Sequence, residues 1–271
     1  MALSLASISK EVKIRAPRMV LLGTEKIGKT SFACGTLFDK QGNVLKAGIN
    51  NPIVISMKGE DGADALDVAQ FPAVTTYNEV IEALSVLYHD DHAYQTVVID
   101  SVSALEPLVW DEVCRLNNCD SIEKACGGYG KGYLEAVALF RKLFDWLDAL
   151  RDKGMASILI GHVKVKRFDD PNGESYDQYQ FDVNDKVANL SFRWADLILF
   201  ANTKVTVKTE KTGFKEKKRG IDITGGNRFL FTQKQPSHPG GGRGFYGRLP
   251  YELPLDYTTF EAAVSALLQA K

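Results

Sequence analysis

The sequence has no long hydrophobic run and no marked excess of charge of either sign. No stretch reaches the roughly 18 consecutive apolar residues that a membrane-spanning helix needs, and the first residues lack the basic-then-apolar pattern of a secretory signal. The 33 basic and 34 acidic residues give a formal net charge of −1. Because such a chain creates no global positive field, nucleic-acid binding would depend on local basic patches. These absences favour a cytoplasmic protein without a membrane partner.

Cysteine is scarce as well. The four cysteines include one closely spaced pair, Cys114 and Cys119, but no second Cys or His pair follows at zinc-finger distance. Sparse cysteines are typical of reduced thiols in a cytoplasmic protein. With 271 residues, 45% of them hydrophobic, the chain can bury one large core. We expect a lead-in over residues 1–17 and a single domain over residues 18–271, with a part rich in β-hairpins at 203–256.

A phosphate-loop pattern stands near the start of that domain. Residues 23–30 read Gly-Thr-Glu-Lys-Ile-Gly-Lys-Thr and match G-x-x-x-x-G-K-[ST]. The apolar residues 19–22 predict a buried strand before the loop, and residues 31–38 predict a helix that continues after it. Backbone N–H groups of such a loop, aimed by a helix N-terminus, form a cradle for phosphate oxygens. The predicted nucleotide-binding residues are Gly23, Thr24, Glu25, Lys26, Ile27, Gly28, Lys29, Thr30 and Ser31.

The pattern also predicts the cofactors, ATP and Mg²⁺. Lys29 would reach the β and γ phosphates, and the Thr30 hydroxyl would ligate the metal. A second motif follows about 70 residues later, where the apolar residues 94–101 predict a buried strand that ends in Asp100. An acid at the tip of the strand beside the phosphate loop holds Mg²⁺, directly or through water. Thr30 and Asp100 are therefore the predicted metal ligands.

The remaining pattern predicts an alternation of strands and helices followed by hairpins. Residues 105–132 are irregular and polar, and residues 163–190 have no clear period, which suggests two long loops. Strands are expected at 52–57, 74–77, 155–162 and 193–200, helices at 80–87, 133–153 and 257–270, antiparallel hairpins over 204–232 with turns at 210–213 and 225–227, and a glycine-rich loop at 239–244.

Several of these segments resemble a known family. The strand, loop and helix at the start, the strand at 97–105, and the later strand that ends in a polar residue are similar to the RecA-like ATPase core. Residues 128–133, 161–162, 168–176 and 194–196 resemble the phage-encoded RecA-like nucleotide-binding proteins implicated in single-strand annealing and recombination. The resemblance covers most of residues 18–255. It implies an α/β, RecA-like P-loop NTPase core with a mostly parallel central sheet flanked by helices, and antiparallel hairpins in the C-terminal third.

The resemblance also implies roles for individual residues. Glu60, after the second strand, matches the glutamate that orients and activates the attacking water, with Asp61 as a rival. His162 matches the polar residue that senses the γ-phosphate. Arg243 is the candidate finger that reaches a neighbouring subunit's site. The predicted catalytic set is Lys29, Glu60, Asp100, His162 and Arg243, with Arg228 and Arg248 as alternatives for the finger.

DNA contacts are implied for two segments, about 106–132 and 163–190, which correspond to the DNA-facing loops of the RecA core. The second segment offers cations for phosphates and aromatic rings for stacking, but it also carries acids that would repel a phosphate backbone. A basic run at 204–219 is a further candidate, although such runs are usually solvated faces. The predicted DNA-binding residues are Lys131, Lys164, Lys166, Arg167 and Phe168.

The function implied is an ATP-dependent protein that binds single-stranded DNA for phage recombination or strand annealing. It would assemble with copies of itself into a ring or filament, with ATP slowly hydrolysed at protomer interfaces, in the cytoplasm of an infected bacterial host. A phage or host single-strand-binding protein is a candidate partner. The alternatives are a nucleotide-gated assembly module with negligible hydrolysis, and a small-molecule P-loop phosphotransferase.

Overall fold

A computed structural model of the chain describes residues 8, 10–11, 13–39, 41, 43–171, 173–212, 215–222 and 226–270, and for residues 205–222 it describes the backbone only. The strands are β1 (Arg18–Gly23), β2 (Leu37–Phe38), β3 (Val44–Lys46), β4 (Pro52–Ser56), β5 (Ala69–Gln70), β6 (Thr96–Asp100), β7 (Ala156–Gly161), β8 (Val163–Phe168), β9 (Tyr176–Phe181), β10 (Leu197–Thr203), β11 (Val205–Thr212), β12 (Lys215–Asp222), β13 (Arg228–Phe231), β14 (Gly241–Gly242) and β15 (Glu252–Pro254). The helices are α1 (Lys29–Ala33), α2 (Tyr77–His89), α3 (Val102–Leu116), α4 (Lys131–Asp152), α5 (Asp185–Trp194) and α6 (Tyr257–Gln269), with 3-10 turns η2 (Ala125–Gly127) and η3 (Gly244–Arg248).

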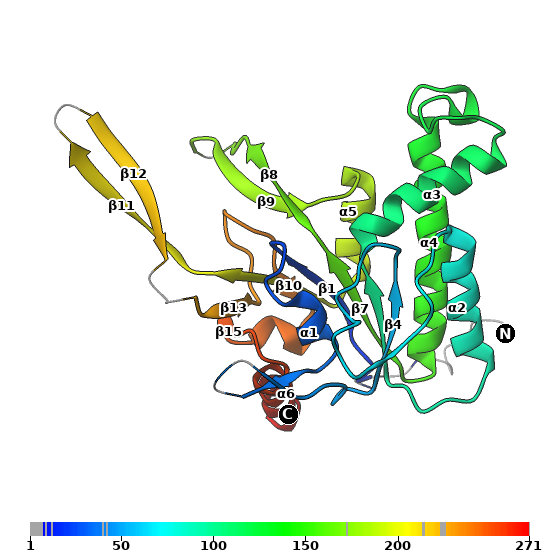
Figure 1. Ribbon diagram of the computed structural model, residues 1–271, viewed down its shortest axis with the longest axis horizontal. Coiled ribbons are helices and arrows are strands. Elements are labelled where there is room, and N and C mark those ends of the chain that lie inside the picture. The colour runs from blue at the N-terminus through cyan, green and yellow to red at the C-terminus, as the bar shows by residue number, and fades with distance from the viewer. Residues whose placement is uncertain are drawn as a thin grey trace.

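The main sheet has the strand order β15-β13-β10-β1-β7-β6-β4-β5, with β14 paired to the start of β10. Strands β10, β1, β7, β6, β4 and β5 run parallel, whereas β13, β14 and β15 run antiparallel to their neighbours. The C-terminal ends of all the parallel strands therefore lie on the same side of the sheet (Figure 1). The predicted α/β fold, with a mostly parallel sheet flanked by helices and with antiparallel hairpins, is confirmed.

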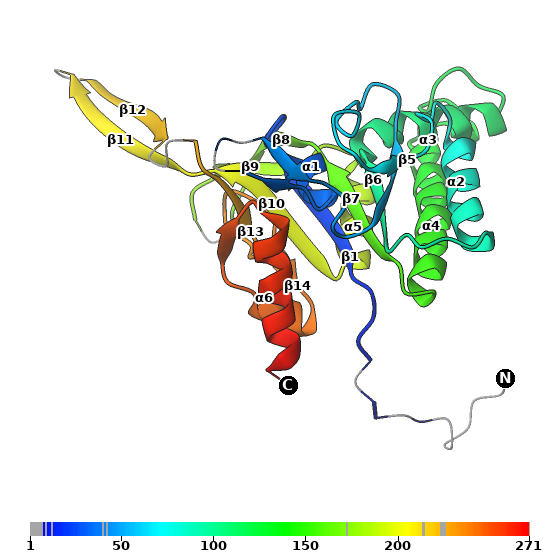
Figure 2. The ribbon, with the colours of Figure 1, turned by 60° about the horizontal axis from the view of Figure 1, so that its bottom comes forward.

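The side chains of each strand alternate between the two faces of the sheet, and the core therefore has two layers. In β1, Val20 and Leu22 pack with α2, α3, α4 and α5, while Met19 and Leu21 pack with α1 and α6 on the other face. Figure 2 shows α6 well apart from the α2–α4 group. Successive residues of a strand point to opposite faces, so one short apolar run can fill both layers. Among the described residues, no helix combines the length and apolarity that crossing a membrane would require.

Two segments expected to be irregular are regular in the structure. Residues 102–116 form α3, which begins at the Ser101 cap, whose hydroxyl accepts the Ala104 N–H at 3.2 Å. The burial of Val102 and Leu105 against α4 and the sheet fixes this helix even though Pro107 lies within it. The expected loop at 163–190 is a hairpin of β8 and β9 followed by the start of α5. The expectation of a long loop was wrong for 163–190 and wrong in part for 105–132, where residues 117–130 are irregular apart from the 3-10 turn η2.

Several smaller boundaries also differ from the sequence expectation. The helix after the phosphate loop ends at Ala33, because Gly35 turns the backbone at a φ of 56°, and residues 37–38 pair with residues 44–46 as β2 and β3. The strand expected at 74–77 is a single bridge at Val74. Residues 193–194 belong to α5 rather than to the next strand. Parts of the predicted lead-in (residues 1–7, 9 and 12) and of the two predicted turns (residues 213 and 225) lie outside the described residues.

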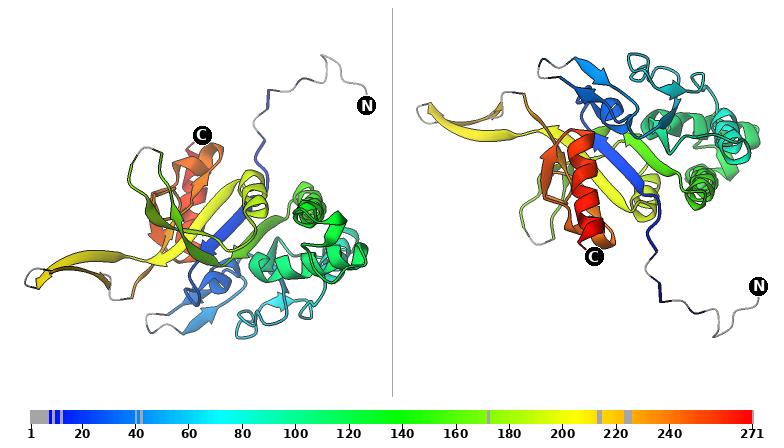
Figure 3. Two further views of the ribbon diagram at one scale, coloured as in Figure 1. Left: turned by 90° about the horizontal axis from the view of Figure 1, so that it is seen from above. Right: turned by 90° about the horizontal axis from the view of Figure 1, so that it is seen from below.

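The β11–β12 hairpin, which we call the arm, projects away from the rest of the protein. It leaves the sheet after β10 and returns at β13, and the two views of Figure 3 both show it extending outward. Its strands, residues 205–212 and 215–222, pair with each other as the alternating sequence predicts, but residues 210–212, expected in a turn, belong to β11. The expected second hairpin does not form, since β13 pairs with β10 and β15 instead of β12.

Candidate nucleotide-binding site

The phosphate loop connects β1 to α1. Gly28 caps the helix at a φ of 106°, a left-handed conformation that favours glycine. The buried Lys29 ammonium donates to the carbonyl oxygens of Gly23 and Thr24 at 2.9 and 2.8 Å. Burial lowers the pKa of Lys29, and the charge of Asp100 opposes that shift. The cation is thus held inside the loop, on the side from which it could turn toward a phosphate.

Thr30 and Asp100 meet although they stand far apart in the sequence. The Thr30 hydroxyl donates to Oδ2 of Asp100 at 2.7 Å. Burial raises the pKa of the Asp100 carboxyl, and the hydrogen bond from Thr30 acts against that shift. Asp100 ends β6, as expected, and β7 lies between β6 and β1 in the sheet. The two side chains still reach each other across the end of β7.

Glu60 lies beside this pair, on the loop after β4. Its Oε1 atom accepts hydrogen bonds from the Ser101 hydroxyl at 2.6 Å and from Nε2 of His162 at 2.9 Å. The bond from His162 lowers the pKa of Glu60, and the same bond raises the pKa of His162. The two groups therefore form an ion pair near neutral pH. Asp61, the rival acid, has no hydrogen bond or ion pair of its side chain in the described residues.

The backbone at this edge is close-packed. A Cβ atom added to Gly62 would lie 2.7 Å from Oγ1 of Thr30, so only glycine lets the Glu60 loop approach the phosphate loop. On the other side, the Arg228 guanidinium at the start of β13 donates to the Ile27 carbonyl at 3.1 Å. The phosphate loop is therefore held from both sides by segments distant in the sequence.

The residues present fit ATP and Mg²⁺. A hydroxyl and a carboxylate oxygen, the hard ligands that Mg²⁺ prefers, lie together at Thr30 and Asp100 beside the loop. His162 adds a polar atom that needs a partner, since its Nδ1 is buried and makes no hydrogen bond within the described part of the chain. A buried nitrogen of this kind is costly to leave unpaired. Thr30 and Asp100 would hold the metal, and the loop with Lys29 would hold the phosphates.

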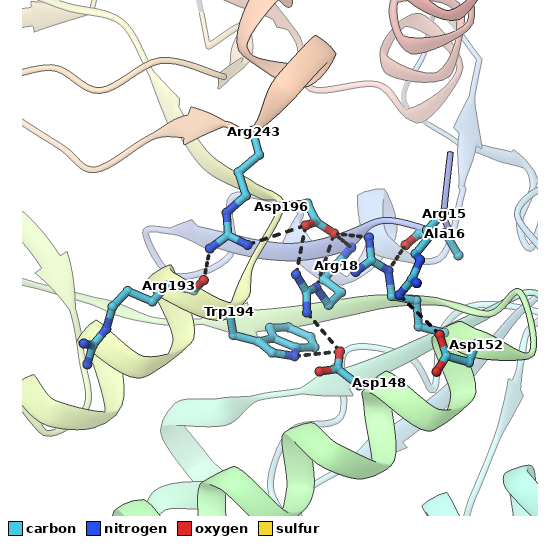
Figure 4. Close-up of polar contacts among 10 residues, drawn as sticks. Arg15, Ala16, Arg18, Asp148, Asp152, Arg193, Trp194, Asp196 and Arg243 are labelled. Carbon is cyan, nitrogen blue, oxygen red and sulfur yellow. Dashed lines mark hydrogen bonds and ion pairs between the residues drawn. The ribbon is translucent and has the colours of Figure 1, made fainter. Parts of the chain in front are cut away.

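Arg243 lies at the N-terminal ends of the parallel strands, whereas Lys29 lies at their C-terminal ends. It pairs with Asp196 at 3.9 Å and donates to the Arg193 carbonyl, beside the start of β1 (Figure 4). Asp196 is nearly buried and also binds Arg18 at 3.0 Å and Arg151 at 2.9 Å. Arg243 therefore cannot reach the phosphate loop of its own chain, and its role as a finger toward a neighbouring protomer stays a prediction. Arg248, the other alternative, lies in η3.

The predicted DNA-binding cations of β8 already have acidic partners. Lys164 pairs with Asp182 at 3.2 Å and Lys166 with Asp185 at 3.3 Å. Arg167 lies 3.9 Å from Asp169, Phe168 packs against Tyr176, and Lys131 begins α4. The structure thus brings Lys29, Thr30, Asp100, Glu60 and His162 together, and leaves the DNA-binding set apart from them on β8 and α4.

The sequence analysis did not name Ser101 or Ser103, and it named Arg228 only as an alternative finger toward a neighbouring subunit. Ser101 donates to Glu60, Ser103 accepts the His162 backbone N–H at 3.0 Å, and Arg228 contacts the phosphate loop in the same chain. Ser101 directly follows Asp100 and Ser103 comes two positions later, and hydroxyls so close to an acid that could bind a metal are a signal that could have been used. No local pattern marks Arg228, because its contact spans 201 positions.

The fold and the site define a P-loop nucleotide-binding protein. The phosphate loop and the Thr30–Asp100 pair lie together at the C-terminal ends of the parallel strands. A family model described as AAA domain (AAA_24) matches residues 15–244. The chain therefore belongs to this family of P-loop ATPases, whose members generally bind ATP with Mg²⁺. No curated protein matches the chain in a sequence comparison.

Proposed function

We propose that the protein is a phage-encoded, RecA-like ATPase that binds single-stranded DNA for recombination or strand annealing. Family membership supports the ATPase activity, and the resemblance of residues 128–133 and 168–176 to phage recombination proteins supports the rest. The protein assembles with copies of itself into a ring or filament, and Arg243 completes the site of a neighbouring protomer. It works in the cytoplasm of an infected bacterium, where a phage or host single-strand-binding protein is its candidate partner.

The observation that carries this proposal is the place of His162 between the site and the β8–β9 hairpin. Its ring is bonded to Glu60, and its backbone carbonyl accepts the Asp182 N–H at 3.0 Å, where the hairpin ends. A change in the hydrogen bonds of Glu60 therefore acts directly on the root of the hairpin. That is the connection a protein needs if its nucleotide state is to govern the shape of a DNA-facing segment.

Each residue of the site has a part in hydrolysis. Mg²⁺, when bound, would neutralise charge on the β and γ phosphates. Lys29 orients the phosphates, and the carboxylate of Glu60 accepts a proton from the attacking water. Because Oε1 of Glu60 is engaged with Ser101 and His162, Oε2 is the oxygen that receives this proton. The low pKa of Glu60 makes it a weak base, which agrees with slow turnover.

ATP turnover measured with and without single-stranded DNA tests the proposal, using the wild type and Lys29→Ala. We expect DNA to stimulate turnover and Lys29→Ala to abolish both the basal and the stimulated rates. Lys142→Ala removes an exposed lysine on α4 and should behave as the wild type does. Turnover that is indifferent to DNA would contradict the DNA-dependent part and leave an ATPase of another purpose.

One observation favours a second function, a module in which nucleotide controls assembly with negligible hydrolysis. Glu60 is tied to two donors and has a lowered pKa, which disfavours proton transfer. Glu60→Gln separates the two functions. A loss of about 100-fold or more in turnover supports hydrolysis with Glu60 as the base, whereas a wild-type rate equal to the buffer blank supports the module.

A further inference from the structure

The arm has a geometry that its own packing does not explain. Its two strands pair over eight positions and with no other strand among the described residues. At about 3.3 Å per residue it is roughly 26 Å long, and it extends from the body in every view of the fold (Figures 1 and 3). An isolated two-stranded hairpin is at best marginally stable in water. A projecting ribbon of this length is therefore expected to serve contact with another molecule.

Charge is unevenly distributed between the chain and the arm. Residues 205–222 contain six cations and three acids, a net charge of +3, in a chain whose total is −1. The remainder of the chain therefore carries −4 and would repel a polyanion. The cations of β8, in contrast, are compensated by acids at 3.2 to 3.9 Å. The arm is therefore a projecting segment with a surplus of positive charge.

The register of the arm gathers this charge on one face. Position 208 stands opposite 219, 210 opposite 217, and 212 opposite 215, and alternate positions of a strand share a face. One face therefore contains the positions of Lys208, Lys215, Lys217 and Arg219, with Glu210 as its single acid. The other face contains two cations and two acids. The cross-strand rows repeat at about 6.6 Å along the ribbon, comparable with the repeat of phosphates in an extended strand.

We propose that the face formed by positions 208, 215, 217 and 219 binds the phosphate backbone of single-stranded DNA. This inference rests on the proposed function and names the surface that the DNA-binding activity uses. A two-stranded ribbon with cations at alternate positions fits a flexible, extended polyanion, which can follow the twist of the ribbon. The β8–β9 hairpin, with its cations compensated, then responds to the nucleotide, while the arm supplies most of the electrostatic attraction.

Two double variants of equal charge test the assignment. Lys217→Gln with Arg219→Gln removes two cations from the proposed face, and Lys211→Gln with Lys218→Gln removes two from the other face of the same ribbon. Binding of a fluorescent 30-nucleotide oligo-dT is measured by anisotropy across a range of salt concentrations. Each lost phosphate contact lowers the salt slope by about 0.7. The first variant should therefore lose about 1.4 from the slope and about 25-fold in affinity at 0.1 M salt.

The control variant, Lys211→Gln with Lys218→Gln, should retain the wild-type salt slope and DNA affinity. Both double variants should keep the wild-type melting temperature and ATP affinity. Equal losses in the two variants, or no loss in either, would overturn the assignment of this face. An unchanged DNA affinity with a loss of self-association in sedimentation would overturn it too, because the arm would then bind a second copy. If the wild type itself binds no oligo-dT, the proposed function fails, a result distinct from failure of the arm alone.

Discussion

Replacement of His162 by Gln tests the coupling between His162 and Glu60. The Gln amide keeps an N–H donor near the place of Nε2, so the hydrogen bond to Glu60 remains and only the positive charge is lost. A hydrogen bond between charged groups is worth ~1.5–3 kcal/mol, and a neutral one ~0.5–1.5 kcal/mol. The difference of about 1 kcal/mol corresponds to roughly 0.7 of a pKa unit. The pKa of Glu60 should therefore rise by about that amount.

The assay is the pH dependence of kcat/KM for ATP. In the wild type, Glu60 is the required carboxylate above its lowered pKa, and His162 stays protonated up to its raised pKa. The acid limb reports the carboxylates of Glu60 and Asp100, whose pKa values the charge of His162 lowers, and the alkaline limb reports His162. In His162→Gln the acid limb should move up by about 0.7 of a unit, and the alkaline limb should disappear. An acid limb that stays at the wild-type position would refute the coupling.

The same pair gives stability a defined pH window. The contribution of Glu60 is present above its unfolded pKa and is lost as pH falls through its lowered folded pKa. The contribution of His162 is present below its unfolded pKa and is lost as pH rises through its raised folded pKa. Urea unfolding across pH should show both losses in the wild type and lack the alkaline one in His162→Gln. His89→Gln, at an exposed position on α2, serves as the control.

Three further substitutions have expected outcomes. Gly62→Ala places a Cβ atom 2.7 Å from Oγ1 of Thr30; we expect about tenfold weaker ATP binding by calorimetry, since overpacking costs ~1–3 kcal/mol, and unchanged affinity would contradict the close approach. Arg228→Ala removes the bond to the Ile27 carbonyl and should weaken ATP binding about fivefold, the equivalent of ~1 kcal/mol, with little change in melting temperature. Asp196→Asn removes the carboxylate that Arg18 and Arg151 share, and Arg18 keeps only Asp148 at 3.0 Å. We expect the free energy of unfolding to fall by about 3 kcal/mol in urea titrations, the low end for a broken buried pair; a loss below 1 kcal/mol would show that the cluster contributes little.

The sequence predicts the parallel sheet well because its strands are buried on both faces. Residues 18–23, 52–56, 96–100 and 156–161 are short continuous apolar runs, and each is a strand in the structure. Segments whose regularity depends on tertiary contacts were missed. Strand β8 is exposed or half-exposed throughout, and its apolar alternation covers only residues 163–166, too short a run to mark a strand. Pro107 is unfavourable in a helix, so the sequence did not indicate α3, whose helical form follows from burial against α4.

The site divides in the same way. Lys29, Thr30 and Asp100 belong to local patterns with a fixed chemical meaning, and the structure brings them together. Glu60 and His162 were placed by resemblance, and their direct bond could not be read from spacing because 102 positions separate them. Arg228 illustrates the limit, since a single exposed arginine in a hairpin region gives no hint of its contact with the phosphate loop.

The strand order has a consequence for synthesis on the ribosome. Strand β1 is made first but pairs with β7 and β10, and Met19 lies opposite Ile158 and Leu197. At 5–20 residues per second, β7 follows β1 after roughly 7–28 s. During that time β1, the strand that leads into the phosphate loop, has no partner strand on either side. Nucleotide can therefore stabilise the nearly finished chain but not the nascent N-terminal half, which has to stay soluble without it.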